Sequence, residues 1–188
     1  VWVVSGDYKL EEDCLSGRFE PIRCNVFITE STFGLPVYHW KPQSTIFFDI
    51  QKWILENHGA GKTSILFAYS LGKSQRLLSC VEATGLPVFL HGAVYNVHST
   101  LVEAGCKLPA VQRVLPDTPK DLLRGNIVIA PGSADGSPWL KRFHPYSTGV
   151  CSGWMQVRGN IRRRNADAGF ALSDHADWDG LLEAVIAT

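Results

Sequence analysis

The densest group of chemically reactive side chains in this sequence lies in the segment LSDHADW at residues 172–178. It places His175 between two aspartates, and histidine is the side chain that titrates nearest neutral pH. A neighbouring carboxylate can fix the tautomer of an imidazole and raise its pKa. The segment therefore predicts a proton-transfer or metal-binding site. The other histidines have no such neighbours in the sequence, and we interpret them as structural or surface residues: His39, His58, His91, His98 and His144.

Two more carboxylates follow apolar segments that are typical of strands. Asp7 comes shortly after the segment 1–4, and Glu30 comes directly after the segment 24–29. Proteins of the α/β class place their active-site groups at the ends of such strands, so both carboxylates are candidates for metal binding or acid–base chemistry. The alternatives are a turn or capping residue for Asp7, and a helix cap or a surface residue for Glu30.

Two segments are similar to phosphate-binding loops. GAGKT at 59–63 looks like the end of a P-loop, but Glu56 stands where the first glycine should, and a helix precedes the segment instead of a strand. We therefore reject nucleotide hydrolysis there and expect a helix end followed by a turn. SLGK at 70–73 is the better candidate, because it follows a strand and begins a helix, whose positive end would favour a phosphate near Lys73.

Basic residues cluster in the C-terminal third, where no acidic residue occurs between Asp135 and Asp167. Uncompensated positive charge is what binding to nucleic-acid phosphates requires, and a solvated loop is the alternative. Trp139 and Trp154 lie in the same stretch and could stack on bases, although we expect at least one of them in the core. The candidate phosphate-binding residues of this stretch are Lys141, Arg142, Arg158, Arg162, Arg163 and Arg164.

An α/β scaffold is expected to position these motifs. Short apolar segments alternate with segments of helical spacing, which predicts a largely parallel sheet covered by helices. The segment 107–123, with three prolines, is expected to be a connecting loop. Helices are expected at 44–57, 74–83, 93–104, 178–187 and, with Ser137 as the N-cap, from Pro138 onward. Strands are expected at 1–4, 24–29, 64–69, 88–90, 126–130, 148–155 and 169–173.

The composition is that of an ordinary globular protein. The 188 residues are 45% hydrophobic and 19% charged, with a formal net charge of +0. No apolar run approaches the length of a membrane helix and no secretory leader opens the chain, so we expect a cytoplasmic protein without a membrane partner. The five cysteines are scattered, and we expect free thiols. Because Val1 stands within a strand, we expect a fragment of a longer protein.

The motifs occur in the order and context of the β-CASP nucleases of the metallo-β-lactamase superfamily, which this sequence resembles. SGDYK, ITESTFG and LSDHADW carry the resemblance, with SILFAYSLGKSQRLL between the second and the third. In those families the corresponding residues are an aspartate that bridges two metal ions and two groups that flank the metals. The resemblance thus assigns metal binding to Asp7 and catalysis to Glu30 and His175.

A closer resemblance is to the ligase-associated DNA exonucleases. It extends over nearly the whole chain and includes GSPWL at 136–140 and SGWMQVRG at 152–159, which is followed by three arginines. It implies metal-dependent hydrolysis of DNA ends, 3′-exonucleolytic and used in DNA repair. It also implies two divalent metal ions, zinc or manganese, and an ATP-dependent DNA ligase as a partner. The alternatives are a β-CASP ribonuclease in RNA processing and a non-catalytic fragment that binds nucleic acid.

The main metal motif of the superfamily, HxHxDH, is absent from this sequence. The resemblance places that motif before Val1, so we expect the complete protein to be the enzyme and this chain alone to be inactive. The resemblance also implies a fold in two parts. Residues 1–34 and 170–188 are expected to belong to a metallo-β-lactamase αββα body, and residues 35–169 are expected to form an inserted β-CASP α/β domain.

Overall fold

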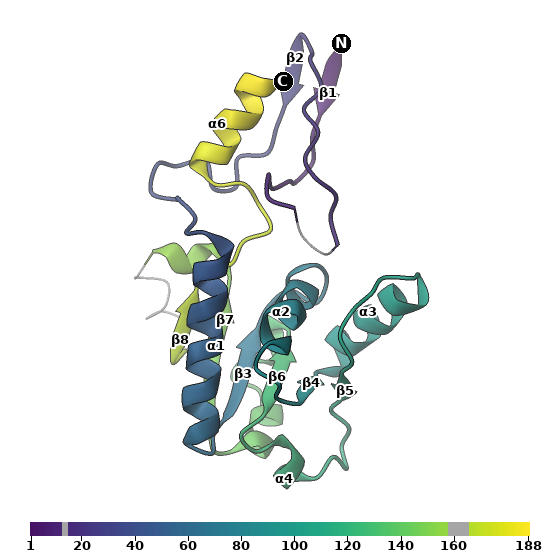
Figure 1. The fold of residues 1–188 in the computed structure, drawn as a ribbon, viewed down its shortest axis with the longest axis vertical. Coiled ribbons are helices and arrows are strands. Elements are labelled where there is room, and N and C mark those ends of the chain that lie inside the picture. The colour runs from purple at the N-terminus through teal and green to yellow at the C-terminus, as the bar shows by residue number, and fades with distance from the viewer. Residues whose placement is uncertain (13–14, 158–165) are drawn as a thin grey trace.

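The computed structural model describes residues 1–12, 15–157 and 166–188 of the chain. Two groups of elements lie one above the other in an elongated molecule (Figure 1). The smaller group contains both termini and comprises β1 (Trp2–Val4), β2 (Val26–Ile28) and α6 (Trp178–Ala187). The larger group contains a six-stranded sheet and its helices. The chain leaves the smaller group after β2 and returns to it only for its last helix.

The six-stranded sheet is parallel in every described pairing, and its strands lie in the order β5-β4-β6-β3-β7-β8. β3 is central, with β6 on one side and β7 on the other. This arrangement confirms the expected α/β class and the largely parallel sheet. The strands are β3 (Thr63–Phe67), β4 (Val88–Leu90), β5 (Gln112–Arg113), β6 (Ile127–Ala130), β7 (Tyr146–Cys151) and β8 (Ala168–Phe170).

Helices and 3₁₀ segments cover both faces of this sheet. Because successive side chains of a strand point to opposite faces, β3 contributes to both cores. Leu66 of β3 packs in a core with α1, α2 and α3, whereas Ile65 and Phe67 pack in a second core with η2. All five residues of β3 are therefore buried. The helices are α1 (Gln43–Gly59), α2 (Lys73–Glu82), α3 (Gly92–Glu103) and α4 (Lys120–Leu123), with 3₁₀ segments η1 (Gly132–Ala134), η2 (Pro138–Phe143) and η3 (Gly153–Gln156).

Two expectations from the sequence are wrong in detail. The segment 107–123 is more than a loop, because it contains β5 and α4, which are too short to produce a periodic pattern. The strand expected at 148–155 ends at Cys151, and η3 follows it. Ser137 is the N-cap residue of η2 and Pro138 begins it, as expected, but the Ser137 hydroxyl donates to the carbonyl oxygen of Ala134 at 2.7 Å and makes no capping bond.

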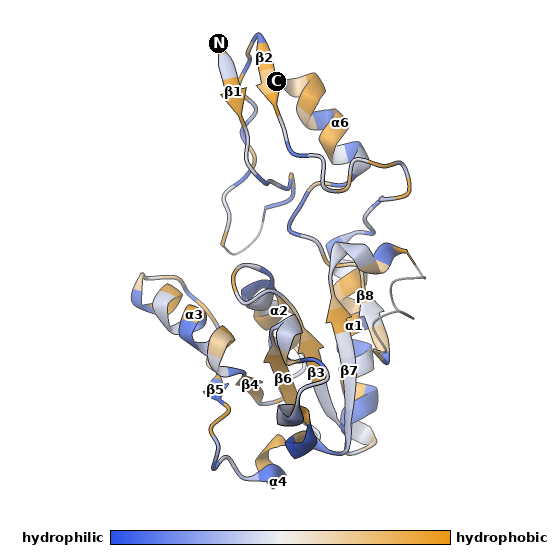
Figure 2. Ribbon diagram, turned by 180° about the vertical axis from the view of Figure 1, so that it is seen from behind, coloured by the Kyte–Doolittle hydropathy of each residue, from blue (hydrophilic) through white to orange (hydrophobic). Residues whose placement is uncertain are grey.

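The smaller group exposes much of its apolar surface. β1 and β2 form a two-stranded parallel sheet, and Figure 2 shows both strands and much of α6 in the hydrophobic colour. Trp2, Val4 and Ile186 are among the most exposed large hydrophobic residues. A sheet of two strands is marginally stable by itself, and contiguous apolar surface on a folded protein marks an interaction surface. No described helix has the length and apolar character needed to cross a membrane.

Candidate active site

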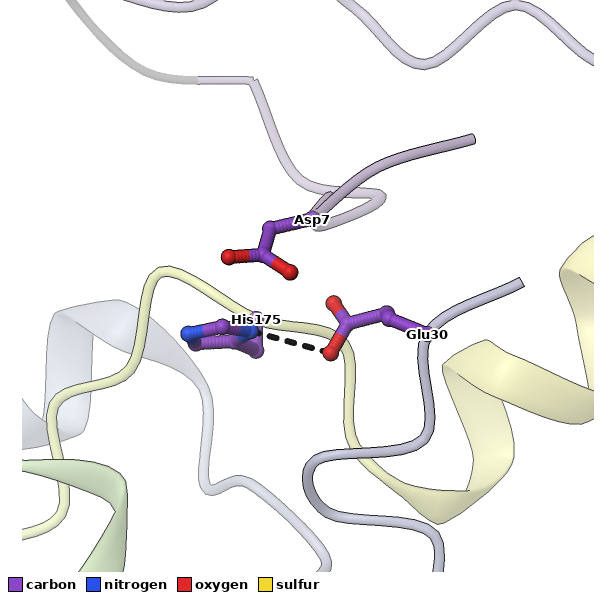
Figure 3. A group of neighbouring side chains, drawn as sticks. All are labelled: Asp7, Glu30 and His175. Atoms are coloured by element: carbon purple, nitrogen blue, oxygen red, sulfur yellow. Dashed lines mark hydrogen bonds and ion pairs between the residues drawn. The ribbon is translucent and has the colours of Figure 1, made fainter. Parts of the chain in front are cut away.

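Asp7, Glu30 and His175 lie together in space although they are far apart in the sequence (Figure 3). Each residue offers one nitrogen or oxygen atom, and these atoms all lie within 4.8 Å of one another. Asp7 follows β1, Glu30 follows β2, and His175 belongs to the loop between β8 and α6. The parallel pairing of β1 and β2 explains the meeting of the two carboxylates, because the carboxyl ends of parallel strands lie at the same edge.

Glu30 holds the imidazole of His175 in a fixed orientation. Its Oε2 atom lies 2.9 Å from Nδ1 of His175, and its Oε1 atom accepts a hydrogen bond from the amide of Tyr8 at 3.1 Å. The Glu30 side chain is only 5% exposed, whereas that of His175 is 26% exposed. The pair therefore resembles the carboxylate–histidine arrangement that sets a tautomer, and Nε2 is the ring nitrogen turned away from Glu30.

The backbone around His175 is held as firmly as its ring. Its amide donates to the hydroxyl oxygen of Ser173 at 3.0 Å, and its carbonyl oxygen accepts from the Trp40 indole at 3.0 Å. The next amide, that of Ala176, donates to the carbonyl oxygen of Tyr8 at 2.7 Å. These bonds tie the loop both to the segment after β1 and to the segment before α1, so the imidazole is positioned by two distant parts of the chain.

An aromatic cluster packs against the other side of the imidazole. The ring of Phe33 lies edge-on to His175, with 5.8 Å between centroids, and also contacts the rings of Trp40 and Trp154. Gly153 permits this packing, because a Cβ atom at that position would lie 2.5 Å from the Phe33 ring. Phe33 is buried, so the cluster forms an apolar wall that limits the approach of water to the histidine from that side.

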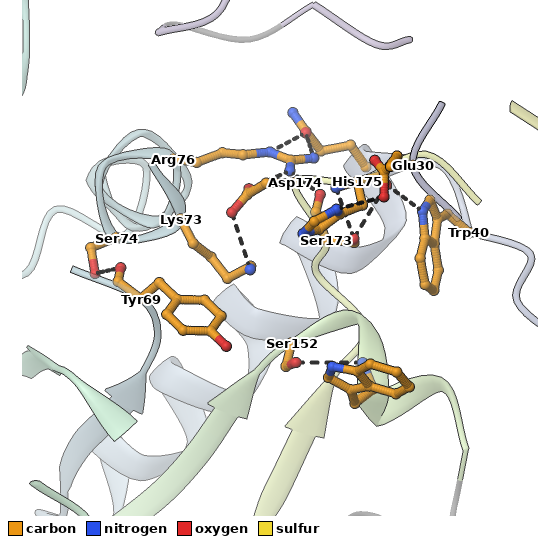
Figure 4. A network of polar contacts seen from close by, with 12 residues as sticks. Glu30, Trp40, Tyr69, Lys73, Ser74, Arg76, Ser152, Ser173, Asp174 and His175 are labelled. Carbon is orange, nitrogen blue, oxygen red and sulfur yellow. Dashed lines mark hydrogen bonds and ion pairs between the residues drawn. The ribbon is translucent and has the colours of Figure 1, made fainter. Parts of the chain in front are cut away.

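A buried basic pair anchors the same loop to the first turns of α2 (Figure 4). Lys73 Nζ lies 3.1 Å from Oδ2 of Asp174, and Arg76 Nη1 lies 3.2 Å from Oδ1 of the same carboxylate. Arg76 also donates to the carbonyl oxygen of Ser173 and to the side-chain oxygen of Gln43. Arg76 therefore connects α1, α2 and the His175 loop, a role that the sequence did not suggest.

We expect Arg76→Leu to destabilise the protein by about 1.5–3 kcal/mol, the range for hydrogen bonds that involve a charged group. The reason is that the carbonyl oxygen of Ser173 and the side chain of Gln43 would lose a buried donor. Urea unfolding of the complete protein measures this change. Arg124→Leu is the matched control, because the exposed side chain of this arginine makes only one long hydrogen bond to the described residues, 3.4 Å to the carbonyl oxygen of Gly61. Equal shifts in the two variants would contradict the anchoring role.

The basic residues expected to bind phosphate do not form one described surface. The Lys73 side chain is only 4% exposed and its ammonium group is paired with Asp174, so it does not present a free cation. Arg142 belongs to η2 and donates to the carbonyl oxygens of Leu115 and Pro116. Because η2 packs against α4, which Figure 1 places at the end of the molecule opposite α6, Arg142 lies on the side away from the smaller group. Lys141 is exposed on the same segment. Four candidates lie outside the described residues: Arg158, Arg162, Arg163 and Arg164.

His39 lies close to two aspartates that are far from it in the sequence. Its Nδ1 lies 2.7 Å from Oδ2 of Asp179, and this contact raises the pKa of the imidazole above its ordinary value. Asp177 completes a second group of three possible metal ligands. Both oxygens of Asp177 already accept backbone hydrogen bonds, from Trp40 and from Gly180 at the start of α6. His39 is exposed and so is a surface residue, as expected, although its pairing with Asp179 could not be seen in the sequence.

The described cysteines have no disulfide partner and are poor nucleophiles where they are buried. Cys24, Cys80, Cys106 and Cys151 are free thiols, as expected. Burial raises the pKa of Cys80 to about 12, and burial also raises the pKa of Cys151. Since the thiolate is the nucleophilic and metal-binding form, neither buried cysteine is suited to catalysis or metal binding.

The donor atoms of Asp7, Glu30 and His175 fit part of a divalent metal site. Carboxylate oxygen and imidazole nitrogen are the ligands that zinc and manganese accept. Within the described residues, the Asp7 carboxylate makes no hydrogen bond or ion pair, so its oxygens are available to an ion. Glu30 is already engaged with His175 and with two backbone amides, those of Tyr8 and Thr32. Asp7 is thus the carboxylate best placed to bind a metal.

Comparison with known proteins relates nearly the whole chain to a segment of one much longer protein. The chain is 33% identical over 183 residues to a probable DNA ligase of Opitutus terrae. The match covers 97% of this chain but 18% of that protein, so the chain spans less than a fifth of its relative. No protein-family model matches the sequence.

Proposed function

We propose that this chain is part of a metal-dependent nuclease that hydrolyses phosphodiester bonds at DNA ends, as a 3′-exonuclease in DNA repair. The observation that carries the proposal is the meeting of Asp7 and Glu30, which follow two parallel strands, with His175 of the β8–α6 loop, their ligand atoms within 4.8 Å of one another. A metal-binding carboxylate beside a histidine oriented by a second carboxylate is suited to phosphodiester hydrolysis.

Each of the three residues has a distinct role in this proposal. Asp7 would hold the divalent ions, which activate water and stabilise the attacking and leaving oxygens when bound. His175 donates a proton from Nε2 to the leaving oxygen, and Glu30 supports the charged imidazole through its 2.9 Å contact with Nδ1. The buried wall formed by Phe33 limits competing water on one side of the imidazole.

The proposal extends to the organisation of the complete protein. Residues 1–34 and 170–188 would form part of a metallo-β-lactamase body, and residues 35–169 would form the inserted β-CASP domain. The exposed apolar side chains of β1, β2 and α6 support this division, because further elements of the body would cover them. The chain alone supplies one metal-binding carboxylate, so activity is proposed for the complete protein only.

DNA is the proposed substrate, and a DNA ligase is the proposed partner. The similarity of this chain to part of a probable DNA ligase supports a function in DNA metabolism. A nuclease that trims strand ends produces termini that a ligase can join, so the two activities act on the same DNA. An RNA substrate and a purely binding function are the competing possibilities that the next experiment separates.

We expect the complete protein, supplied with zinc or manganese, to shorten single-stranded DNA from its 3′ end faster than RNA of the same sequence. The measurement uses two strands of each kind, one labelled at the 5′ end and one at the 3′ end. Removal of nucleotides from a 3′ end releases the 3′ label at once and shortens the 5′-labelled strand stepwise. Faster cleavage of RNA would favour the ribonuclease, and binding without cleavage of either strand would favour a binding module.

A further inference from the structure

A cavity lies at the carboxyl ends of the central strands, next to the candidate active site. It measures about 390 Å³ and is formed where the chain leaves β3, β6 and β7. The hydroxyl-bearing and aromatic residues that line it are Phe67, Tyr69, Ser70, Ser133, Ser152 and Trp154. The volume falls within the range of small-ligand pockets, which begins at about 300 Å³.

The topology of the sheet explains why a cavity forms there. From β3 the chain continues into α2, which packs on one face, and from β6 it continues into η2, which packs on the other face. β3 and β6 are neighbours, so their connections diverge to opposite sides of the sheet. Such a switch point leaves a crevice outside the carboxyl ends of the strands, where α/β proteins bind ligands.

Two aromatic rings with large exposed surfaces border the cavity. Tyr69 is 72% exposed and Trp154 is 42% exposed. The backbone of Tyr69 is fixed, because its carbonyl oxygen accepts from the hydroxyl of Ser74 at 2.6 Å and from the amide of the same residue at 3.2 Å. Figure 4 shows the Tyr69 ring below the side chain of Lys73. An exposed aromatic ring on a fixed backbone is a stacking platform for a flat ligand.

The remaining chemistry of the cavity favours an uncharged, flat heterocycle. None of the described residues that line it carries a charge, and serine hydroxyls contribute donors and acceptors at its rim. Lys73 lies 5.0 Å from the Tyr69 ring centroid, and its charge is balanced by Asp174. A nucleobase has this combination of π faces and polar edges.

The cavity and the candidate active site share the same packed residues. Phe33 contacts both the Trp154 ring, at 4.9 Å between centroids, and the His175 ring, at 5.8 Å. On the other side, Lys73 contacts Tyr69 and pairs with Asp174, the neighbour of His175 in the sequence. A strand with a phosphodiester at His175 would therefore place a nearby base over the cavity.

From these contacts we infer that the cavity between Tyr69 and Trp154 binds one unpaired base of the DNA strand whose phosphodiester lies at His175. The inference rests on the proposed function for the identity of the strand. It adds a subsite that holds a base by stacking, which is tolerant of sequence because every base has a π face. An unpaired base can enter the cavity, whereas a base inside a duplex must first leave the stack.

The test compares the binding of fluorescent single-stranded DNA by the complete protein and by Tyr69→Ala, in EDTA so that no strand is consumed. We expect a loss of about 5- to 150-fold in affinity, which corresponds to the stacking of one base. Tyr69→Phe retains the ring and should bind within about twofold of the parent. Phe48→Ala removes a ring of similar exposure, 64% against 72% for Tyr69, from α1 outside the cavity, and should bind like the parent.

A set of strands that each lack one base at a different position completes the test. At the position that occupies the cavity, loss of the base should weaken the parent and abolish the difference between the parent and Tyr69→Ala. If Tyr69→Ala binds the intact strand as tightly as the parent does, or loses affinity equally for every abasic strand, the subsite is wrong. These assays measure binding and require no cleavage. The test of the subsite and the test of nuclease activity can therefore give different outcomes.

Discussion

Replacement of His175 by alanine in the complete protein is expected to lower kcat by roughly 10²–10⁴-fold, the range for a positioned acid or base. The imidazole is held by Glu30 at Nδ1 and directs its other nitrogen away from that carboxylate. A group used mainly in the transition state changes kcat without changing ground-state binding. Single-turnover cleavage and the Kd for DNA, measured on the same preparation, check this result.

Two further variants show whether the effect belongs to this histidine. His39→Ala removes another histidine that lies 2.7 Å from a carboxylate, and it should cleave at the parent rate. Glu30→Gln should be slower than the parent, but Glu30→Gln combined with His175→Ala should be no slower than His175→Ala, because Glu30 acts through the histidine. A parent rate for His175→Ala would make His175 a structural residue, and additive losses in the double variant would give Glu30 a separate function.

Removal of the Asp7 carboxylate is expected to abolish cleavage through loss of metal. Within the described residues this carboxylate has no other partner, so its oxygens are free to bind an ion, and a divalent ion stabilises phosphoryl-transfer charge by several kcal/mol. Asp7→Ala should therefore cleave on the order of 10³-fold more slowly or worse, since each 1.4 kcal/mol is a factor of ten. Part of the rate should return at high manganese concentration. A parent-like rate and metal requirement would remove Asp7 from the site.

The meeting of Asp7 and Glu30 could be predicted because each residue follows an apolar strand, whereas His175, which follows a strand of the other sheet, was joined to them only by the family resemblance. Parallel strands place their carboxyl ends at one edge, so polar groups after two neighbouring strands must converge. The α/β class followed from the same alternation of short apolar segments and helical segments. These predictions depend on local patterns that the chain displays within about ten residues.

The contacts that hold the His175 loop in place could not be predicted, because they join residues that are far apart in the sequence. Arg76 donates to Ser173, which lies 97 positions away, and His39 contacts Asp179 across 140 positions. One signal was available for Arg76: it stands one turn after Lys73 at the start of a helix, where buried basic residues need carboxylate partners. No comparable pattern marked Phe33 as the ring that joins His175 to Trp154.

The metal content of purified variants tests the central claim most directly, because the account separates Asp7, which binds metal, from His175, which acts on the chemical step. Metal stoichiometry should be measured after desalting, on the same preparations of the parent, Asp7→Ala and His175→Ala used for single-turnover rates. The account predicts that His175→Ala keeps the metal content of the parent while Asp7→Ala loses it. If His175→Ala loses its metal as Asp7→Ala does, His175 is a metal ligand and the account of its catalytic role is contradicted.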